Sequence, residues 1–319
     1  MTDILYDSAA NPRPDNAKAG FITARDGVPL RYACFAATGR PLAGTVVILS
    51  GRNECIEKYF ETIRDLSAVG LGSAIMDWRG QGGSGRLLKN PMRGHVRSFH
   101  DYVADLDQFF AEVVLPDCRG PYFILAHSTG SLIALMAAPL MVNRVRRMVL
   151  IAPFLEVVNM PMSMPAIRRT AGILYRLGLG SFYAYGGKRP KETPPFATNK
   201  LTSDIDRYVR NTGLYEAHPQ LALGGPTVSW IRAACIASET VRDPDFMRKI
   251  QMPVLIIAAG ADEVVSTRAV ETYARRLRTG SLLTIDGARH EILQEADIYR
   301  EQLLAAFKAF VPGENPPPL

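Results

Sequence analysis

The chain has 319 residues, of which 47% are hydrophobic and 21% are charged, as in an ordinary globular protein that can bury a large core. The formal net charge is a mild +6. Lysines and arginines are spread along the chain without interleaved aromatic residues, and this excludes nucleic-acid binding as a leading function. The charge is compatible with a weak attraction to an anionic membrane surface.

The cysteines and the apolar runs give expectations about compartment. Cys34, Cys55, Cys118 and Cys235 form no CxxC pair, so we expect isolated thiols rather than a disulfide framework or a zinc site. The first twenty residues lack the basic and apolar segments of a signal peptide. The longest apolar run, 132–142, is too short to span a bilayer. We therefore expect a cytoplasmic protein whose membrane contact is at most peripheral, at the inner face.

Short apolar runs alternate with helical patterns along much of the chain. The runs predict strands at 21–24, 30–35, 45–49, 73–78, 122–126, 147–151, 253–258 and 281–285. Helices are predicted at 54–69, 98–114, 129–141, 267–278 and 293–310, the second with a capping box of Ser98 and Asp101. Most runs are continuous rather than alternating, which is typical of strands covered on both faces. The sequence therefore predicts an α/β protein with a doubly wound, mostly parallel sheet.

The alternation stops between residues 154 and 245. This region is rich in proline and glycine, its helical pieces look short, and no strong strand is visible. We interpret it as a helical cap inserted into the sheet. The predicted organisation is a core of 1–153 and 246–312, a cap of 154–245, and a disordered Pro-rich tail of 313–319.

A nucleophile motif follows the fifth predicted strand. The segment Ala126-His-Ser-Thr-Gly130 joins a strand of bulky residues to a helix of small and apolar ones. A nucleophile elbow has this arrangement, with the serine on a strained turn and small residues two positions away on each side. Ser128 is the predicted nucleophile. The alternative is that Ser128 caps the helix, as serines often do.

A serine nucleophile needs a base and a group that orients the base. Two histidines follow Ser128 in the chain, His218 inside the insertion and His290 directly after the last predicted strand. Catalytic groups gather at the carboxyl ends of parallel strands, which favours His290. Asp262 follows the preceding strand and completes the order serine, acid, histidine. Its neighbour Glu263 is the alternative acid.

Two main-chain N–H groups are candidates for an oxyanion hole. Thr129 begins the helix after the nucleophile, where its N–H is free to donate to an anion. Arg52 lies in the loop after an early strand, next to Gly51, which we expect to let the backbone approach the substrate. A second glycine-rich turn, Asp77-Trp-Arg-Gly-Gln-Gly-Gly-Ser-Gly, lacks the lysine of a P-loop and is interpreted as a structural turn below the pocket.

These segments resemble the lysophospholipase and monoacylglycerol-lipase branch of the α/β-hydrolases, in particular bacterial lysophospholipase L2-type sequences. The resemblance rests on 50–59, 77–85, 126–130, Asp262 and 287–291, with a further cap segment at 199–204. It implies an eight-stranded sheet, a helical cap after the sixth strand, no metal or organic cofactor, and hydrolysis of a single acyl ester of glycerol. It also implies Ser128, Asp262 and His290 as the triad. Many relatives have His-Gly at 50–51 and glycine at 126.

The insertion gives one indication of the substrate. Its basic residues are Arg168, Arg169, Arg176, Lys188, Arg189, Lys191 and Lys200, against a single acid, Glu192, in 160–200. Apolar residues are interleaved with them, which suits a lipid-like ester at a membrane surface, or only packing of the cap. The other candidate functions are an esterase, thioesterase or aminopeptidase on the same scaffold, and a non-catalytic protein that binds membranes.

Overall fold

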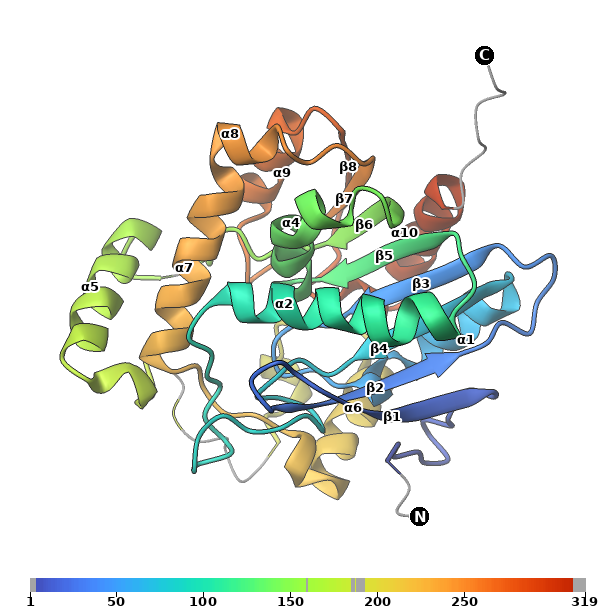
Figure 1. Ribbon diagram of the computed structural model, residues 1–319, viewed down its shortest axis with the longest axis horizontal. Helices are drawn as coiled ribbons and strands as arrows, with labels where there is room; N and C mark the ends of the chain where they lie inside the picture. The colour runs from blue at the N-terminus through green and yellow to red at the C-terminus, as the bar shows by residue number, and fades with distance from the viewer. Residues whose placement is uncertain (1–3, 159, 185–186, 188–192, 312–319) are drawn as a thin grey trace.

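The computed structural model describes residues 4–158, 160–184, 187 and 193–311. Its centre is an eight-stranded sheet in the order β1-β2-β4-β3-β5-β6-β7-β8 (Figure 1). The strands are β1 (Ala17–Thr23), β2 (Pro29–Phe35), β3 (Gly44–Leu49), β4 (Leu71–Met76), β5 (Tyr122–His127), β6 (Val145–Ile151), β7 (Val254–Ala259) and β8 (Gly280–Ile285). The pairs β1–β2 and β2–β4 are antiparallel and the others are parallel. The predicted doubly wound sheet is confirmed.

Helices cover both faces of the sheet. The helices outside the segment between β6 and β7 are α1 (Phe60–Ala68), α2 (Phe99–Phe109), α3 (Leu115–Asp117), α4 (Thr129–Met141), α9 (Thr267–Arg276) and α10 (Asp297–Phe310). In Figure 1, α2 and α4 lie in front of the sheet, and α1 and α10 lie behind it. The predicted capping box of α2 is present, since the Ser98 and Asp101 side chains each accept a main-chain N–H. Because both faces are covered, every residue of β3, β4 and β7 is buried.

The segment between β6 and β7 contains longer helices than the sequence predicted. They are α5 (Met164–Arg176), α6 (Ile205–Ala217) and α7 (Val228–Arg242), of 13, 13 and 15 residues, followed by the short α8 (Pro244–Met247). The expectation of only short helices is wrong because the breakers stand mostly at helix ends. Pro165 lies in the first turn of α5, where proline is tolerated, and Gly178 follows the end of that helix.

Helix α7 also contributes to the main hydrophobic core, through Trp230, Ala233 and Ala234. The division of the chain into a core and a cap stays a prediction. The tail 313–319 and the cap residues Lys188, Arg189, Lys191 and Glu192 lie outside the described residues. Among the described residues, no helix is both long and apolar enough to cross a bilayer.

Two cysteines lie together, contrary to expectation. The Sγ atoms of Cys34, on β2, and Cys118, after α3, are 3.6 Å apart, and both thiols are free. They are 84 positions apart in the sequence. Spacing along the chain could not reveal the contact, because it arises only when the sheet forms.

Candidate active site

Ser128 stands on a strained turn between β5 and α4. Its φ of 51° and ψ of −113° lie outside the regions that L-residues usually adopt. The side chain makes no capping hydrogen bond to α4, so the alternative role as a helix cap is wrong. A Cβ atom at Gly130 would collide with the carbonyl oxygens of Leu49 and Ser50. The turn therefore requires glycine at 130 and directs the Ser128 hydroxyl away from the helix.

Ser128, His290 and Asp262 form one chain of hydrogen bonds. The Ser128 Oγ lies 3.0 Å from His290 Nε2, and His290 Nδ1 lies 2.8 Å from Asp262 Oδ2. The other carboxylate oxygen of Asp262 accepts the N–H groups of Val264 and Val265, at 2.7 and 2.9 Å. Because Asp262 accepts at Nδ1, the neutral ring carries its proton there and leaves Nε2 free to accept the serine proton. This geometry suits nucleophilic acyl transfer.

Neither alternative residue reaches this chain of hydrogen bonds. His218 stacks on the ring of Tyr6, with ring centroids 4.2 Å apart. The side chain of Glu263 is 52% exposed and pairs with Lys200 at 3.4 Å. Asp262, by contrast, has a side chain that is 1% exposed. The structure thus brings together the residues that the sequence favoured.

The two predicted oxyanion donors are available. Among the described residues, the main-chain N–H groups of Arg52 and Thr129 have no hydrogen-bond partner. Thr129 is the first residue of α4, so its N–H also lies at the positive end of the helix. In the described part of the chain, no group of three or more His, Cys, Asp or Glu side chains is placed to hold a metal ion.

The glycine-rich turn 77–85 holds the loop that contains Arg52. Trp78 Nε1 donates to the Ser50 carbonyl at 2.9 Å, and the Gln81 side chain accepts the Asn53 N–H at 2.8 Å. Gly80 and Gly82 have φ values of 81° and 54°, which glycine adopts readily. The turn is therefore structural, and it fixes the position of the oxyanion loop from below.

The family and the relatives agree with this geometry. The family model Hydrolase_4, described as "Serine aminopeptidase, S33", matches residues 40–297. The chain belongs to this family. It is 37% identical over 305 residues to lysophospholipase L2 of Escherichia coli K12, covering 92% of this chain and 87% of the relative. It is 26% identical to the probable lysophospholipase L2 of Haemophilus influenzae, covering 91% of each chain.

Solved structures of other proteins share the fold. The chain is similar to a soluble variant of monoglyceride lipase from Saccharomyces cerevisiae, with a TM-score of 0.74 at 19% identity over 96% of this chain and 98% of that one. It is also similar to a monoacylglycerol lipase of Paleococcus ferrophilus, with a TM-score of 0.68 at 22% identity over 88% and 97%. At these identities the likeness shows the fold alone.

In this Hydrolase_4 protein a buried polar network lies beside Ser128, and sequence reasoning did not find it. Its centre is the carboxylate of Glu54, which accepts from the Gly51 N–H, from Lys58 at 3.0 Å and from Tyr59 at 2.6 Å. Lys58 also binds Glu291 at 2.6 Å, next to His290 in the chain. Burial alone would raise the pKa of Glu54, but Lys58 and His127 outweigh it and hold the pKa well below its ordinary value.

His127 connects this network to the main chain of His290. Its Nδ1 lies 3.0 Å from Glu54 Oε1, and its Nε2 lies 3.1 Å from the His290 carbonyl oxygen. Both partners can only accept, so both ring nitrogens must carry protons for the two bonds to form. Burial lowers the pKa of His127, but the Glu54 carboxylate raises it by more, and the net shift is upward. His127 is thus a positioning residue that holds the backbone of His290.

The network gives Gly51 a structural role that the sequence did not reveal. A Cβ atom there would lie 2.9 Å from both Glu54 Oε2 and His127 Nδ1. Gly51 therefore makes room for these two side chains, and its expected role in the approach of the substrate stays a prediction. The sequence held only indirect signals, namely the position of His127 before Ser128 and the spacing of Glu54 and Lys58 for an i,i+4 ion pair.

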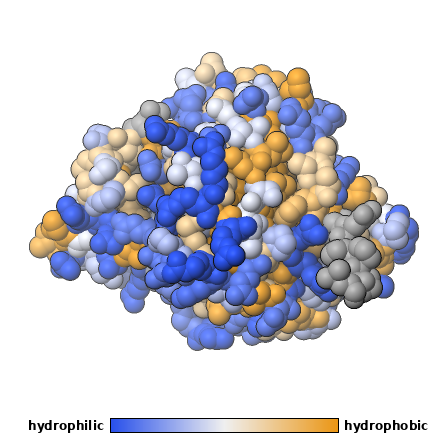
Figure 2. Space-filling view, turned by 90° about the horizontal axis from the view of Figure 1, so that it is seen from above, coloured by the Kyte–Doolittle hydropathy of each residue, from blue (hydrophilic) through white to orange (hydrophobic). Residues whose placement is uncertain are grey.

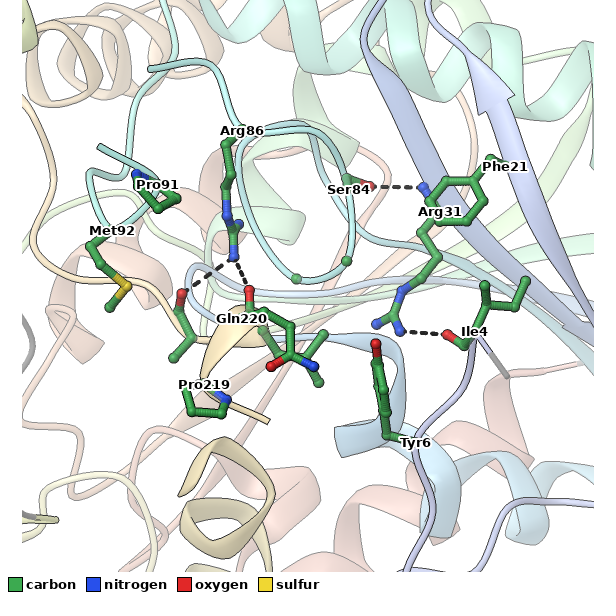
Figure 3. A pocket seen from close by; sticks show the side chains of 14 residues that line it. Ile4, Tyr6, Phe21, Arg31, Ser84, Arg86, Pro91, Met92, Pro219 and Gln220 are labelled. Atoms are coloured by element: carbon green, nitrogen blue, oxygen red, sulfur yellow. Dashed lines mark hydrogen bonds between the residues drawn. The ribbon is translucent and has the colours of Figure 1, made fainter. Parts of the chain in front are cut away.

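A separate cavity of about 330 Å³ opens beside the turn 77–85 (Figure 3). Arg31, Arg86 and Tyr6 line it, and none of the five predicted site residues does. Arg31 is bound there to Glu57 and Asp77 at 2.7 and 2.6 Å. Arg86 donates to main-chain carbonyls of 220 and 222. The cavity therefore lies outside the candidate active site.

Proposed function

We propose that the protein releases the fatty acid of a single-chain lipid, a lysophospholipid or a monoacylglycerol, through an acyl-enzyme on Ser128. The protein is a carboxylic-ester hydrolase. The observation that carries the proposal is the hydrogen-bonded chain Ser128–His290–Asp262, with contacts of 3.0 and 2.8 Å. The curated relatives named lysophospholipase L2 and phospholipase support the lipid ester as substrate.

The reaction has two halves. His290 Nε2 takes the proton of Ser128 as its oxygen attacks the ester carbonyl carbon, and the N–H groups of Arg52 and Thr129 bind the resulting oxyanion. The tetrahedral intermediate then collapses, and His290 protonates the departing alcohol. Water attacks the acyl-enzyme by the same route and releases the fatty acid. Each oxyanion donor contributes about 3 kcal/mol of transition-state stabilisation.

An aminopeptidase is the second candidate, because the family description names that activity. An aminopeptidase binds the positive amine of its substrate, which calls for a free carboxylate in the pocket. The buried carboxylates beside the site, Glu54 and Glu291, are both bound to Lys58. Neither of these two carboxylates is free to bind an amine, and an arginine lies nearby, which suits a neutral or anionic substrate and favours the lipid ester.

We also propose that the protein works as a peripheral protein at a membrane surface. On α5 and the turn after it, Ile173, Leu177 and Phe182 are 59%, 69% and 52% exposed. Figure 2 shows hydrophobic residues at the left edge of the molecule, where α5 lies in Figure 1. Exposed Arg169 and Arg176 lie on the same helix. Apolar side chains flanked by arginines suit the interface of an anionic bilayer.

Release of fatty acid tests the proposal. Purified protein is given lysophosphatidylcholine and, separately, a monoacylglycerol with the same acyl chain, with Ser128→Ala as the matched variant. We expect release from at least one substrate, and a loss of at least about a thousandfold in the variant. An aminoacyl anilide and a thioester, tested in parallel, measure the alternatives.

Two outcomes would contradict parts of the proposal. If neither lipid is hydrolysed while Ser128 still reacts with a fluorophosphonate probe, the lipid substrate is wrong and the nucleophile stands. If Ser128→Ala hydrolyses the lipids as fast as the unmodified protein, the nucleophile is wrong.

A further inference from the structure

Arg52 brings a positive charge into the candidate site without a carboxylate partner. Its side chain is partly buried and lies over the ring of Trp230, with Cζ 5.5 Å from the ring centroid. Nη2 donates to the Gly224 carbonyl, and Nε is buried without any hydrogen-bond partner. Burial lowers the pKa of Arg52 to about 10, so the group is still a cation at neutral pH.

Among the described residues, Arg31, Arg79 and Arg300 are buried, and each is paired with a carboxylate. Arg31 pairs with Glu57 and Asp77, and Arg79 pairs with Asp105 at 2.6 Å. Removing a charge from water without a partner costs several kcal/mol, so proteins rarely leave one in this state. Among the described residues, Arg52 forms no ion pair. Its guanidinium is therefore ready to receive an anion that the protein does not supply.

The guanidinium is connected to the nucleophile turn through two aromatic side chains. The ring of Trp230, on which it rests, contacts the ring of Phe154 with centroids 5.9 Å apart. The Phe154 N–H donates to the Ser128 carbonyl at 3.1 Å. On its other side, a Cβ atom at Gly94 would lie 2.6 Å from Arg52 Nη2, so the missing side chain there makes room for the guanidinium.

We infer that the Arg52 side chain is a subsite for the phosphate of a lysophospholipid head group. The inference rests on the proposed function and deepens it. The main-chain N–H of Arg52 is a proposed donor to the reacting carbonyl. The guanidinium of the same residue therefore lies no farther from the ester than the length of one arginine side chain. In a 1-acyl lysophospholipid five bonds separate the ester oxygen from phosphorus, which is a similar span. A guanidinium binds phosphate oxygens with two parallel N–H groups. An apolar acyl chain, by contrast, is not stabilised by contact with a charged group.

The test compares two esters that share an acyl chain, lysophosphatidylcholine with its phosphate and 1-monoacylglycerol without one, in the same mixed micelles. The variants are Arg52→Met and Arg52→Lys, with Arg168→Met as the control, since Arg168 is an exposed arginine of α5 paired with Glu239. We expect Arg52→Met to lower the ratio of kcat/KM, lysophospholipid over monoacylglycerol, by about 10- to 100-fold, mainly through KM. Arg52→Lys restores part of the ratio, and Arg168→Met leaves it unchanged.

A second measurement separates the anion sources. We expect glycerophosphocholine to inhibit the unmodified protein competitively and Arg52→Met to lose this inhibition. If Arg52→Met instead relieves inhibition by free fatty acid alone, the anion is the product carboxylate and the phosphate subsite is wrong. An equal loss on both esters, with normal reaction of Ser128 toward a fluorophosphonate, also overturns the subsite and makes Arg52 structural. If the unmodified protein hydrolyses neither ester, the proposed function itself is wrong, and the subsite that rests on it is wrong as well.

Discussion

Asp262 is held more firmly than its role as a partner of His290 alone requires. One oxygen accepts from His290, and the other accepts two main-chain N–H groups, those of Val264 and Val265. The second set of bonds fixes the orientation of the carboxylate. It also leaves the acceptor pointing at Nδ1, which sets the tautomer that the base needs. The side chain of the adjacent Glu263 is 52% exposed and pairs with Lys200 instead.

Asp262→Asn tests this assignment against its neighbour. An amide at this position can present N–H to His290 Nδ1, which stabilises the wrong tautomer, so we expect kcat to fall by about 10³–10⁴-fold with little change in fold. Glu263→Gln, which changes an exposed carboxylate paired with Lys200, is expected to stay within twofold of the unmodified protein. Initial rates of ester hydrolysis and near-ultraviolet circular dichroism measure the two effects. Equal losses in the two variants would contradict the assignment.

At the scale of elements, the sheet places the site residues by topology. Ser128 follows β5, Asp262 follows β7 and the 286–290 turn follows β8. Strands β5, β6, β7 and β8 are consecutive and parallel in the sheet. Their carboxyl ends therefore meet at one edge. Each of these residues could be predicted because each stands within five residues of the end of an apolar run, although β8 is only partly buried. The network of Glu54, His127 and Lys58 could not, because its contacts join residues 73 and 233 positions apart.

The exposed face of α5 gives a prediction at the same scale. If Leu177, 69% exposed, enters the bilayer interface, Leu177→Asp removes apolar area and adds a charge that anionic lipid repels. We expect about tenfold weaker binding to vesicles of phosphatidylglycerol and phosphatidylethanolamine. The matched control is Ile298→Asp on α10, where the isoleucine is also 69% exposed. Co-sedimentation with vesicles measures both, and equal effects of the two changes would count against α5 as the membrane-binding face.

At the scale of the whole molecule, one carboxylate links the segment between β6 and β7 to the helices that pack on the sheet. Glu61 of α1 accepts from Arg207 and Arg210 of α6, each at 2.6 Å, and Arg207 also binds Asp297 of α10. No local pattern in the sequence predicts this contact, since Arg207 and Glu61 are 146 positions apart. The position of α6 against α1 and α10 therefore could not be predicted from the sequence.

Glu61 makes the stability of this contact depend on pH. Burial alone would raise the pKa of Glu61, but hydrogen bonds from Arg207 and Arg210 lower it from 4.5 to about 2. Because the folded-state pKa is depressed, the stabilisation is fully present above about pH 4.5 and is lost as the pH falls toward 2. Glu61→Gln cannot ionise, so we expect it to be less stable by roughly 1–3 kcal/mol at pH 7. The difference from the unmodified protein should shrink at pH 3.

Urea denaturation at pH 7 and pH 3 measures this difference, with Glu301→Gln, an exposed carboxylate of α10, as the control. Glu61→Gln and the unmodified protein are expected to differ in their free energy of unfolding. If this difference is the same at both pH values, the ion pair is not its cause, because a loss of packing alone does not depend on pH. If the difference in free energy of unfolding is smaller at pH 3 than at pH 7, ionised Glu61 stabilises the packing of α6 against α1 and α10. Helix α6 would then be expected to separate from α1 and α10 before the sheet itself unfolds.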